Sequence, residues 1–236
     1  MGLRNVRAQI EKDLGDASDR QYFSPAVYSQ YRVTLPLIRE HARGRFIDLG
    51  CGEMPYRPFV ESQTERYDTF DIEERAAGVT YIGDIQSMPQ VPSDTYDTAV
   101  SLEVLEHVPD PRRALAEVFR ILRAGGTVVL SVPHLSRLHE EPYDFFRYTR
   151  HGLRRLLEDA GFEDVTVLRR GGLLSFLGHQ VSTLLLTLTW RVPGLRQVAW
   201  QLNKWLVTRL AFELDGRLDR DGIFAMGYTA VASKPE

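Results

Sequence analysis

The sequence contains one cysteine and no excess of basic residues. The single cysteine, Cys51, cannot form an intrachain disulfide, so a disulfide-stabilised secreted fold is excluded. The 29 Lys and Arg residues are outnumbered by 32 Asp and Glu residues, and a formal net charge of -3 provides no overall positive field to attract nucleic acid. Because the charged residues near Met1 lack the apolar stretch of a secretory signal, we expect a cytoplasmic protein.

The composition is that of a soluble globular protein, with 43% hydrophobic and 26% charged residues among 236. Apolar residues have helical spacing at 3–14 and at about 25–43. Strand-like runs follow at 45–52, where the run ends in glycines, and at 67–72, 79–82, 96–102, 127–132, 162–168 and 222–233, with helical stretches at about 111–123 and 150–160. Because parallel strands need a crossover connection, usually a helix, this alternation predicts an α/β fold. We expect a seven-stranded, mostly parallel sheet with helices on both faces.

One segment departs from the average composition. Between Gly171 and Phe212 the sequence has four basic residues, all three tryptophans and no acidic residue. It lies directly before the last expected strand. We therefore divide the chain into an N-terminal helical cap (1–44), an α/β core (45–170 and 222–236) and an apolar, basic helical insertion (171–221).

The insertion carries no formal charge over residues 173–190. As a helix this stretch would be about 27 Å long, short of the roughly 30 Å hydrocarbon core, so we do not expect a membrane span. We expect two amphipathic helices, separated at Pro193-Gly194, with apolar stripes at Leu177, Val181, Leu184 and Leu188 and at Leu195, Val198, Leu202 and Trp205. Two interpretations are open. The stripes pack on each other, on a second copy of the chain as a homodimer, or over a pocket; or residues 173–212 lie in an anionic membrane interface.

A glycine-containing turn follows the first strand in the run Asp48-Leu49-Gly50-Cys51-Gly52. Glycine lets a ligand approach the backbone closely, and a carboxylate such as that of Asp48 accepts hydrogen bonds from an ammonium group. A ligand at the carboxyl end of a parallel sheet is the usual arrangement for nucleotides. The turn therefore indicates a nucleotide-like ligand, with a plain tight turn as the alternative.

Acidic residues also follow the second and third strands. Asp71 could accept from both hydroxyls of a ribose, with Ile72 against a base. Asp84 and Ile85 could contact the exocyclic amine and the flat face of adenine. The dinucleotide motif Gly-x-Gly-x-x-Gly is broken at Pro55, and an acid beside the glycines repels a pyrophosphate but tolerates a cation. The pattern therefore favours a cationic nucleoside over NAD.

In these features the chain resembles the class I S-adenosylmethionine-dependent methyltransferases, close to the small-molecule group called type 11. The resemblance covers about residues 45–170 and is carried by FIDLGCGEMPY, TFDIEE, GDIQSMP, YDTAVSLEVLEHVPDPRRALAEVFRILRAGGTVVLSVP and LLEDAGF. It implies a Rossmann-like fold, S-adenosylmethionine as cofactor, and an antiparallel last strand beside the sixth. The implied cofactor-binding residues are Asp48, Gly50 and Gly52 (methionine portion), Asp71 (ribose), Asp84 and Ile85 (adenine), and Ser101, Leu102 and Glu103 (sulfonium end). The chain departs from the family at Met54-Pro55, where many relatives have a third glycine.

Methyl transfer from a sulfonium is an in-line displacement, so the protein mainly aligns the acceptor and excludes water. A hydroxyl acceptor also needs a base, and His134 and His139, which follow the fifth strand, are our candidates. His107, after the fourth strand, is expected to have a structural role.

The loop that begins at His139 gathers acidic, aromatic and basic side chains. We take Tyr143, Arg147 and Tyr148 as candidates for contact with the acceptor; alternatively, the loop is an internally bonded connector. The loop has no established spacing of metal ligands, so no metal is expected.

The sequence thus predicts a cytoplasmic methyltransferase that acts on a small-molecule, sugar or lipid-linked acceptor, at oxygen. One alternative is a cofactor-binding or scaffold protein with the same fold and no turnover, and a third is an NAD-dependent oxidoreductase. Nucleic acid is not an expected partner, whereas contact with a membrane surface and a homodimer remain open.

Overall fold

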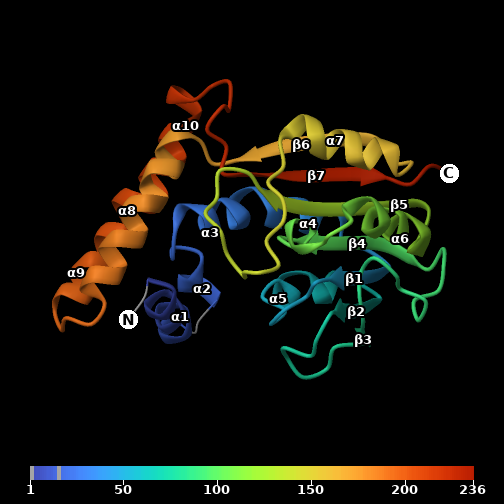
Figure 1. Ribbon diagram of the computed structural model, residues 1–236, viewed down its shortest axis with the longest axis horizontal. Coiled ribbons are helices and arrows are strands. Elements are labelled where there is room, and N and C mark those ends of the chain that lie inside the picture. The colour runs from blue at the N-terminus through green and yellow to red at the C-terminus, as the bar shows by residue number, and fades with distance from the viewer. Residues whose placement is uncertain (1–2, 15–16) are drawn as a thin grey trace. The chain divides into compact units, whose positions relative to one another are not determined.

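The computed structural model describes residues 3–14 and 17–236 (Figure 1). Its contacts divide the chain into two compact units. The first consists of Met1–Val33 and Arg169–Met226, and the second of Thr34–Leu168 and Gly227–Glu236. This grouping differs from the division expected from composition, because the first N-terminal helices and the insertion share one hydrophobic core.

The second unit is built on a seven-stranded sheet, in which β6 runs on into the first unit (Figure 1). The strands are β1 (Arg45–Leu49), β2 (Arg66–Asp71), β3 (Tyr81–Ile82), β4 (Tyr96–Leu102), β5 (Leu122–Pro133), β6 (Glu163–Arg170) and β7 (Gly227–Ser233). Their order is β3-β2-β1-β4-β5-β7-β6. The strands β1 to β5 pair in parallel, and β7 lies antiparallel to β5. The expected α/β fold, with its antiparallel last strand beside the sixth, is confirmed.

Helices cover both faces of this sheet. They are α4 (Leu35–His41), α5 (Arg57–Val60), α6 (Pro111–Ile121) and α7 (Arg150–Asp159), with 3-10 turns η2 (Glu61–Gln63) and η3 (Leu105–His107). On one face Phe46, Val100 and Val129 pack against Ile38 of α4 and Val60 of α5. All positions of β4 are buried except the last, so the opposite face is covered as well. The hydrophobic core of the unit therefore lies on both sides of the central strands.

Two strands are shorter than the sequence pattern indicates. The third was expected from Val79, but Thr80 and Thr69 bond to each other through side-chain hydroxyls and backbone amides, and these bonds replace the strand ladder there. The last was expected from Gly222. It begins at Gly227, and the amides of the residues at 223 and 224 donate to the Asp219 carboxylate in place of a strand ladder.

The first unit is helical. It contains α1 (Leu3–Leu14), α2 (Ala17–Arg20), α3 (Pro25–Ser29), α8 (Leu173–Thr189), α9 (Leu195–Leu202) and α10 (Ala211–Leu218), with π-helical segments η1 (Gln30–Thr34), which continues into the second unit, and η4 (Asn203–Leu210). Its core is formed by Ile10, Phe23, Leu186 and two tryptophans, Trp190 and Trp200. The insertion is therefore not an isolated appendage, because its tryptophans complete a core with the N-terminal helices.

The start of α8 depends on a contact from α10. Gly172, the residue before the helix, has no side chain to accept the first amides. The buried Asp215 carboxylate of α10 accepts hydrogen bonds from the amides of Leu174 (2.7 Å) and Ser175 (3.2 Å) instead. An acid in this position satisfies donors that the helix leaves unpaired and complements the helix dipole.

The amphipathic pattern of α8 is inverted relative to an ordinary surface helix. Its buried positions are mostly polar: Ser175, His179, Ser182 and Thr183, with Leu186. Its stripe of Leu177, Val181, Leu184 and Leu188 is exposed, by 75% at Leu188. Apolar exposed residues continue on the next helical stretch, at Leu195, Val198, Leu202, Trp205, Leu206 and Leu210. We call these ten residues the apolar face.

None of the described helices combines the length and the hydropathy that a membrane span requires.

Candidate active site

The glycine turn after β1 is bonded to the neighbouring strand β2. The amide of Gly50 donates to the carbonyl of Phe70 at 2.7 Å, and the amide of Gly52 donates to the Asp71 carboxylate at 2.8 Å. The second Asp71 oxygen accepts the amide of Ile72 at 2.8 Å. Parallel pairing of β1 with β2 thus brings the turn and Asp71 together, as the sequence predicted.

Glycine is required at position 50 for two reasons. Its φ of +77° lies in the left-handed region, and a Cβ there would approach Cγ2 of Val104 far inside van der Waals contact. At Gly52, with φ of +51°, a Cβ would meet nothing within 4 Å, so the backbone faces open space. Met54 has φ of +55° although it is not glycine. The chain thus keeps a left-handed conformation after Gly52 with Met54 in place of the family's third glycine.

Asp48 is a buried carboxylate without a basic partner among the described residues. It is 5% exposed and accepts a hydrogen bond from the Tyr67 hydroxyl at 2.7 Å. Burial raises the pKa of Asp48 to about 6; the Tyr67 hydrogen bond opposes this rise, and the nearby charge of Asp71 adds to it. A buried negative charge next to an open backbone turn suits a cationic ligand.

The positions expected around the nucleoside follow β2 and β3, which are adjacent in the sheet. Ile72 is 67% exposed beside Asp71, as an apolar surface for a base would be. Asp84 is exposed and accepts hydrogen bonds from the backbone and side chain of Gln86, while Ile85 is buried. The structure therefore places these residues at one sheet edge, but Ile85 presents little side-chain surface.

The residues expected near the sulfonium lie at the end of β4, next to β1. Ser101 is buried, and Leu102 is partly exposed. Glu103 has φ of +54° and accepts a hydrogen bond from the Ser131 hydroxyl at 3.0 Å, which ties it to β5. The four strand ends together thus line one edge that fits S-adenosylmethionine: an open glycine backbone, a ribose-type carboxylate and a buried anion for a cation.

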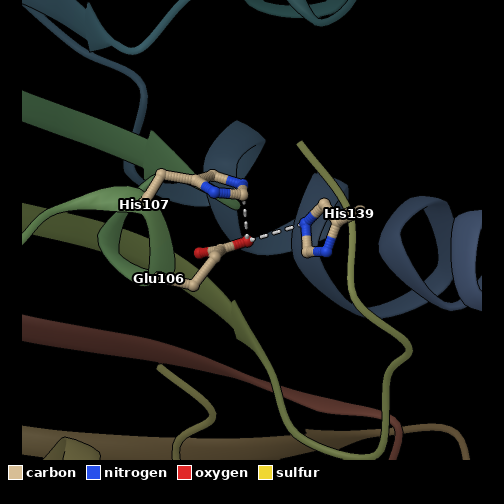
Figure 2. A group of neighbouring side chains, drawn as sticks. All are labelled: Glu106, His107 and His139. Carbon is tan, nitrogen blue, oxygen red and sulfur yellow. Dashed lines mark ion pairs between the residues drawn. The ribbon is translucent and has the colours of Figure 1, made fainter. Parts of the chain in front are cut away.

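A second group of titratable side chains lies beyond β4 (Figure 2). Glu106, in η3, is fully buried, and its Oε1 lies 3.7 Å from His107 Nε2 and 3.6 Å from His139 Nε2. The two imidazole rings meet edge to face, 4.7 Å apart. Burial raises the pKa of Glu106, and the contact with Glu106 raises the pKa of His139. His139 thus lies beside a buried carboxylate, which favours the protonated form of its imidazole.

The loop that follows β5 is internally bonded. The Arg147 guanidinium contacts the Asp144 carboxylate at 2.5 and 2.7 Å and keeps the pKa of Asp144 near 2. It also donates to the carbonyls of Ser136 and Arg137. The Tyr148 hydroxyl is buried and donates to the carbonyl of Leu105 at 2.8 Å. Arg147 and Tyr148 are therefore bonded within the protein, as the interpretation of this loop as an internally bonded connector expects.

Tyr143 and His134 differ from these bonded residues. Tyr143 is 65% exposed, and its backbone carbonyl lies 2.8 Å from His107 Nδ1. His134 directly follows β5 and is partly exposed; its ring lies 5.5 Å from that of Tyr228. Its Nδ1 is buried without a hydrogen-bond partner among the described residues. The two candidate bases are thus in different environments, and only His134 lacks a carboxylate neighbour.

Sequence reasoning missed Glu106 as a member of the site. Its place inside the Glu-Val-Leu-Glu-His run was visible, but a carboxylate on a short turn after a strand is normally solvated. Only the packing of the 134–149 loop over η3 buries it: the amides of Phe145 and Phe146 donate to its backbone carbonyl. That contact joins segments about forty residues apart, which no local pattern reveals.

Comparison with known proteins gives the following similarities. A family profile described as a methyltransferase domain matches residues 20–167. A probable S-adenosylmethionine-dependent methyltransferase of Mycolicibacterium smegmatis is 26% identical over 240 residues, covering 88% of this chain and 89% of that one. Rice 2-methyl-6-phytyl-1,4-hydroquinone methyltransferase 2 is 35% identical over 104 residues, and the match spans 42% of this chain and 29% of the rice protein. Ubiquinone biosynthesis O-methyltransferase of Aromatoleum aromaticum is 24% identical over 154 residues, 52% of this chain and 66% of that one.

Among solved structures, phosphoethanolamine N-methyltransferase 2 of Haemonchus contortus in complex with S-adenosyl-L-methionine is similar in fold. Its TM-score is 0.59 at 14% identity, and the match covers all of this chain and 60% of that one. Identity at this level supports the fold alone.

The Asp71 carboxylate provides a first test of the site. We expect Asp71→Ala to weaken S-adenosylmethionine binding by about 10- to 100-fold, because a charged acceptor for the ribose and for the Gly52 amide is lost. Calorimetric titration measures the change. Asp94→Ala, which removes an exposed acid paired with Lys234, serves as the matched control and should bind as the wild type does. Wild-type affinity in Asp71→Ala would contradict the assignment.

Asp48 should oppose stability while it supports binding. Its pKa in the folded protein, about 6, lies above its ordinary value of 3.8, so the destabilisation grows as the pH rises between these values and is complete above about 6. We expect Asp48→Asn to raise the free energy of unfolding at pH 7.5 by about 1–3 kcal/mol and by less at pH 5, with weaker cofactor binding.

Urea denaturation without cofactor at the two pH values measures the stability of Asp48→Asn, and calorimetry measures the affinity. Tyr67→Phe is the control, because it removes the hydrogen bond to Asp48 and should lower stability at pH 7.5. A lower stability of Asp48→Asn at both pH values would show that the charge of Asp48 is compensated in the free protein.

Proposed function

Because the chain belongs to the methyltransferase domain family, we propose that it transfers the methyl group of S-adenosylmethionine to a hydroxyl oxygen of an apolar or lipid-linked molecule. The enzyme class and the cofactor that the sequence predicted are confirmed by the family match and by the S-adenosylmethionine-dependent relative. The NAD-dependent and non-enzymatic alternatives are set aside on the same grounds.

The protein residues have few tasks in this reaction. S-adenosylmethionine supplies a methyl group that is already activated on a sulfonium. Asp48, Asp71 and the glycine turn bind and orient this cofactor at the sheet edge, with the buried charge of Asp48 favouring a cation. Alignment of the acceptor oxygen for in-line attack and exclusion of water account for the rest.

An oxygen acceptor needs a group that removes its proton. We assign this task to His134, because it follows β5 at the same edge of the sheet and has no ion-pair partner among the described residues. His139, the other candidate from the sequence, contacts Glu106 and Asp144, and both acids raise its pKa. A larger fraction of His139 therefore already carries a proton and cannot take one from the acceptor. The ubiquinone O-methyltransferase among the relatives supports oxygen as the methylated atom.

The apolar face is the main evidence for the kind of acceptor and for where the enzyme works. A helix that buries serine, threonine and histidine and exposes leucine and valine has its apolar side toward another apolar medium. The name of one relative includes a phytyl hydroquinone, and that of another refers to ubiquinone biosynthesis. We infer that the enzyme takes its acceptor from a membrane.

Charge supports an anionic membrane as the occupant of the apolar face. The segment from Gly171 to Phe212 contains Arg191, Arg196, Lys204 and Arg209 and no acid, a net charge of four positive units. Trp205 on this face is 48% exposed, and the Arg209 guanidinium lies 5.3 Å from its ring centre. Exposed tryptophan beside basic residues is typical of helices that lie in the interface plane.

Methyl transfer can be tested with labelled cofactor. We expect transfer from methyl-labelled S-adenosylmethionine to a prenylated catechol or hydroquinone in micelles, with the product a methyl ether by mass spectrometry. His134→Gln should lower kcat by roughly 10²- to 10⁴-fold with unchanged cofactor affinity, because the base is lost. His151→Gln, on the exposed surface of α7, is the control. Label on nitrogen of phosphatidylethanolamine or on a ring carbon, in place of oxygen, would contradict the proposal.

Membrane binding can be tested by flotation. We expect the protein to float with vesicles that contain phosphatidylglycerol and to bind them less at high salt, because part of the attraction is electrostatic. Leu184→Glu and Leu188→Glu should abolish flotation. Ile223→Glu, at an equally exposed apolar residue outside the apolar face, should not.

Two outcomes would remove the membrane proposal. One is that the wild-type protein stays unbound with anionic and neutral vesicles alike. The other is a concentration-dependent dimer that Leu184→Glu dissociates, which would show that a second copy covers the apolar face.

A further inference from the structure

Glu106 is a buried carboxylate that is not hydrogen-bonded within the described part of the chain. Its side chain is fully buried, and neither oxygen has a hydrogen-bond partner among the described residues. Isolated carboxylates in protein interiors are strongly disfavoured unless they are paired, hydrogen-bonded or bound to a metal. The nearest side chains that can carry a positive charge are those of His107 and His139, and both are too far away for a hydrogen bond.

The three side chains converge on one point from two segments (Figure 2). Glu106 and His107 come from η3, and His139 comes from the loop after β5. One ligand atom from each residue lies within 4.8 Å of the other two. Ligands held at about 2.1 Å around a tetrahedral ion are about 3.4 Å apart, so the separations of 3.6 and 3.7 Å from Oε1 require a small contraction.

The hydrogen bonds of the two imidazoles involve Nδ1 and leave Nε2 of each ring available to bind a metal ion. His107 Nδ1 lies 2.8 Å from the Tyr143 carbonyl, which can only accept, so this nitrogen carries the proton. His139 Nδ1 lies 3.3 Å from the Arg137 carbonyl and 3.4 Å from Asp144 Oδ2, both acceptors. Arg147 Nη2, a donor, is also 3.4 Å from this nitrogen, but it has a much shorter hydrogen bond of 2.7 Å to Asp144 Oδ2. In each neutral ring the Nε2 lone pair is then directed at Glu106, as in metal sites whose histidines are held by a carbonyl or carboxylate.

We propose that Glu106, His107 and His139 bind a divalent transition-metal ion through a carboxylate oxygen and two Nε2 atoms. Two imidazoles and one carboxylate suit Zn²⁺ or Fe²⁺ more than the oxygen-seeking Mg²⁺ or Ca²⁺. Three protein ligands leave at least one coordination position open. The two imidazoles are partly exposed, by 19% at His107 and 33% at His139, so the open coordination position can face solvent or an oxygen donor of a bound molecule.

Asp144 acts on this site through His139. Its carboxylate is bound by Arg147 and by the backbone amide of His139, at 2.9 Å, so its position is fixed by three donors. A carboxylate behind a metal-binding histidine orients the ring and increases its basicity. No metal was expected from the sequence, because the spacing of possible ligands within the 139–144 loop fits no established metal site. The proposed site combines His139 of that loop with a turn more than thirty residues earlier.

The metal alone tests the proposal. The whole chain, stripped with a chelator and dialysed, is titrated with Zn²⁺ and with Co²⁺, by calorimetry and by visible absorption of bound Co²⁺. We expect one ion per chain and a ligand-field spectrum of low-symmetry, four- or five-coordinate Co²⁺. Glu106→Gln and His139→Ala should each weaken binding by more than about 100-fold, and Asp144→Asn by about 10- to 100-fold.

The controls separate this site from other histidines. His151→Ala removes an exposed imidazole on α7 and should bind both ions as the wild type does. Circular dichroism in chelator verifies that each variant is folded, and His107→Gln replaces any variant that is not. Absence of Co²⁺ binding to the wild type, or equal binding by wild type and Glu106→Gln, would overturn the proposal. Because no acceptor is added, these results do not depend on the proposed methylation.

Discussion

The hydrogen bond from the Gly52 amide to the Asp71 carboxylate joins the end of β1 to the end of β2, and the sheet edge that we propose as the cofactor site depends on it. A turn with left-handed residues at Gly50, Gly52 and Met54 is conformationally costly unless its amides have fixed acceptors. Asp71 and the Phe70 carbonyl provide those acceptors. Parallel pairing of β2 with β1 then determines which way the turn faces. The order of the strands in the sheet places the ends of β3 and β4 at the same edge.

Unfavourable buried charge is concentrated at the same edge. Asp48 and Glu106 are both buried, and burial raises the pKa of each. Elsewhere in the second unit buried acids have close partners: Asp68 contacts Arg66 at 2.8 Å and the hydroxyl of Tyr96 at 3.0 Å. Stability alone would not select buried carboxylates that have no lysine or arginine partner among the described residues. Their position at strand ends indicates that ligands complete their electrostatic environment.

In the helical first unit, polar side chains are buried and hydrogen-bonded while leucines are exposed. Two buried hydroxyls on α8 bond to backbone carbonyls: Ser182 donates to Phe23 at 3.1 Å and Thr183 to His179 at 2.8 Å. Asn203 of η4 donates to the carbonyl of Tyr22 at 2.8 Å. These bonds allow a polar interior, which leaves the leucines to the outside. The tryptophans are divided in the same way: Trp190 and Trp200 pack in the core, and Trp205 lies on the apolar face.

The sequence alone determined the features that depend on local pattern. The alternation of strands and helices, the glycine turn and the acids after β1, β2 and β3 were all visible, because parallel strands place their carboxyl ends at one edge. Tertiary structure decided the rest. Periodicity located the stripe on α8 but could not say which side faces the interior, since that depends on Phe23 and the N-terminal helices. Spacing could not find Glu106 with His139, because the contact forms only when the loop after β5 closes over η3 and excludes water from the carboxylate.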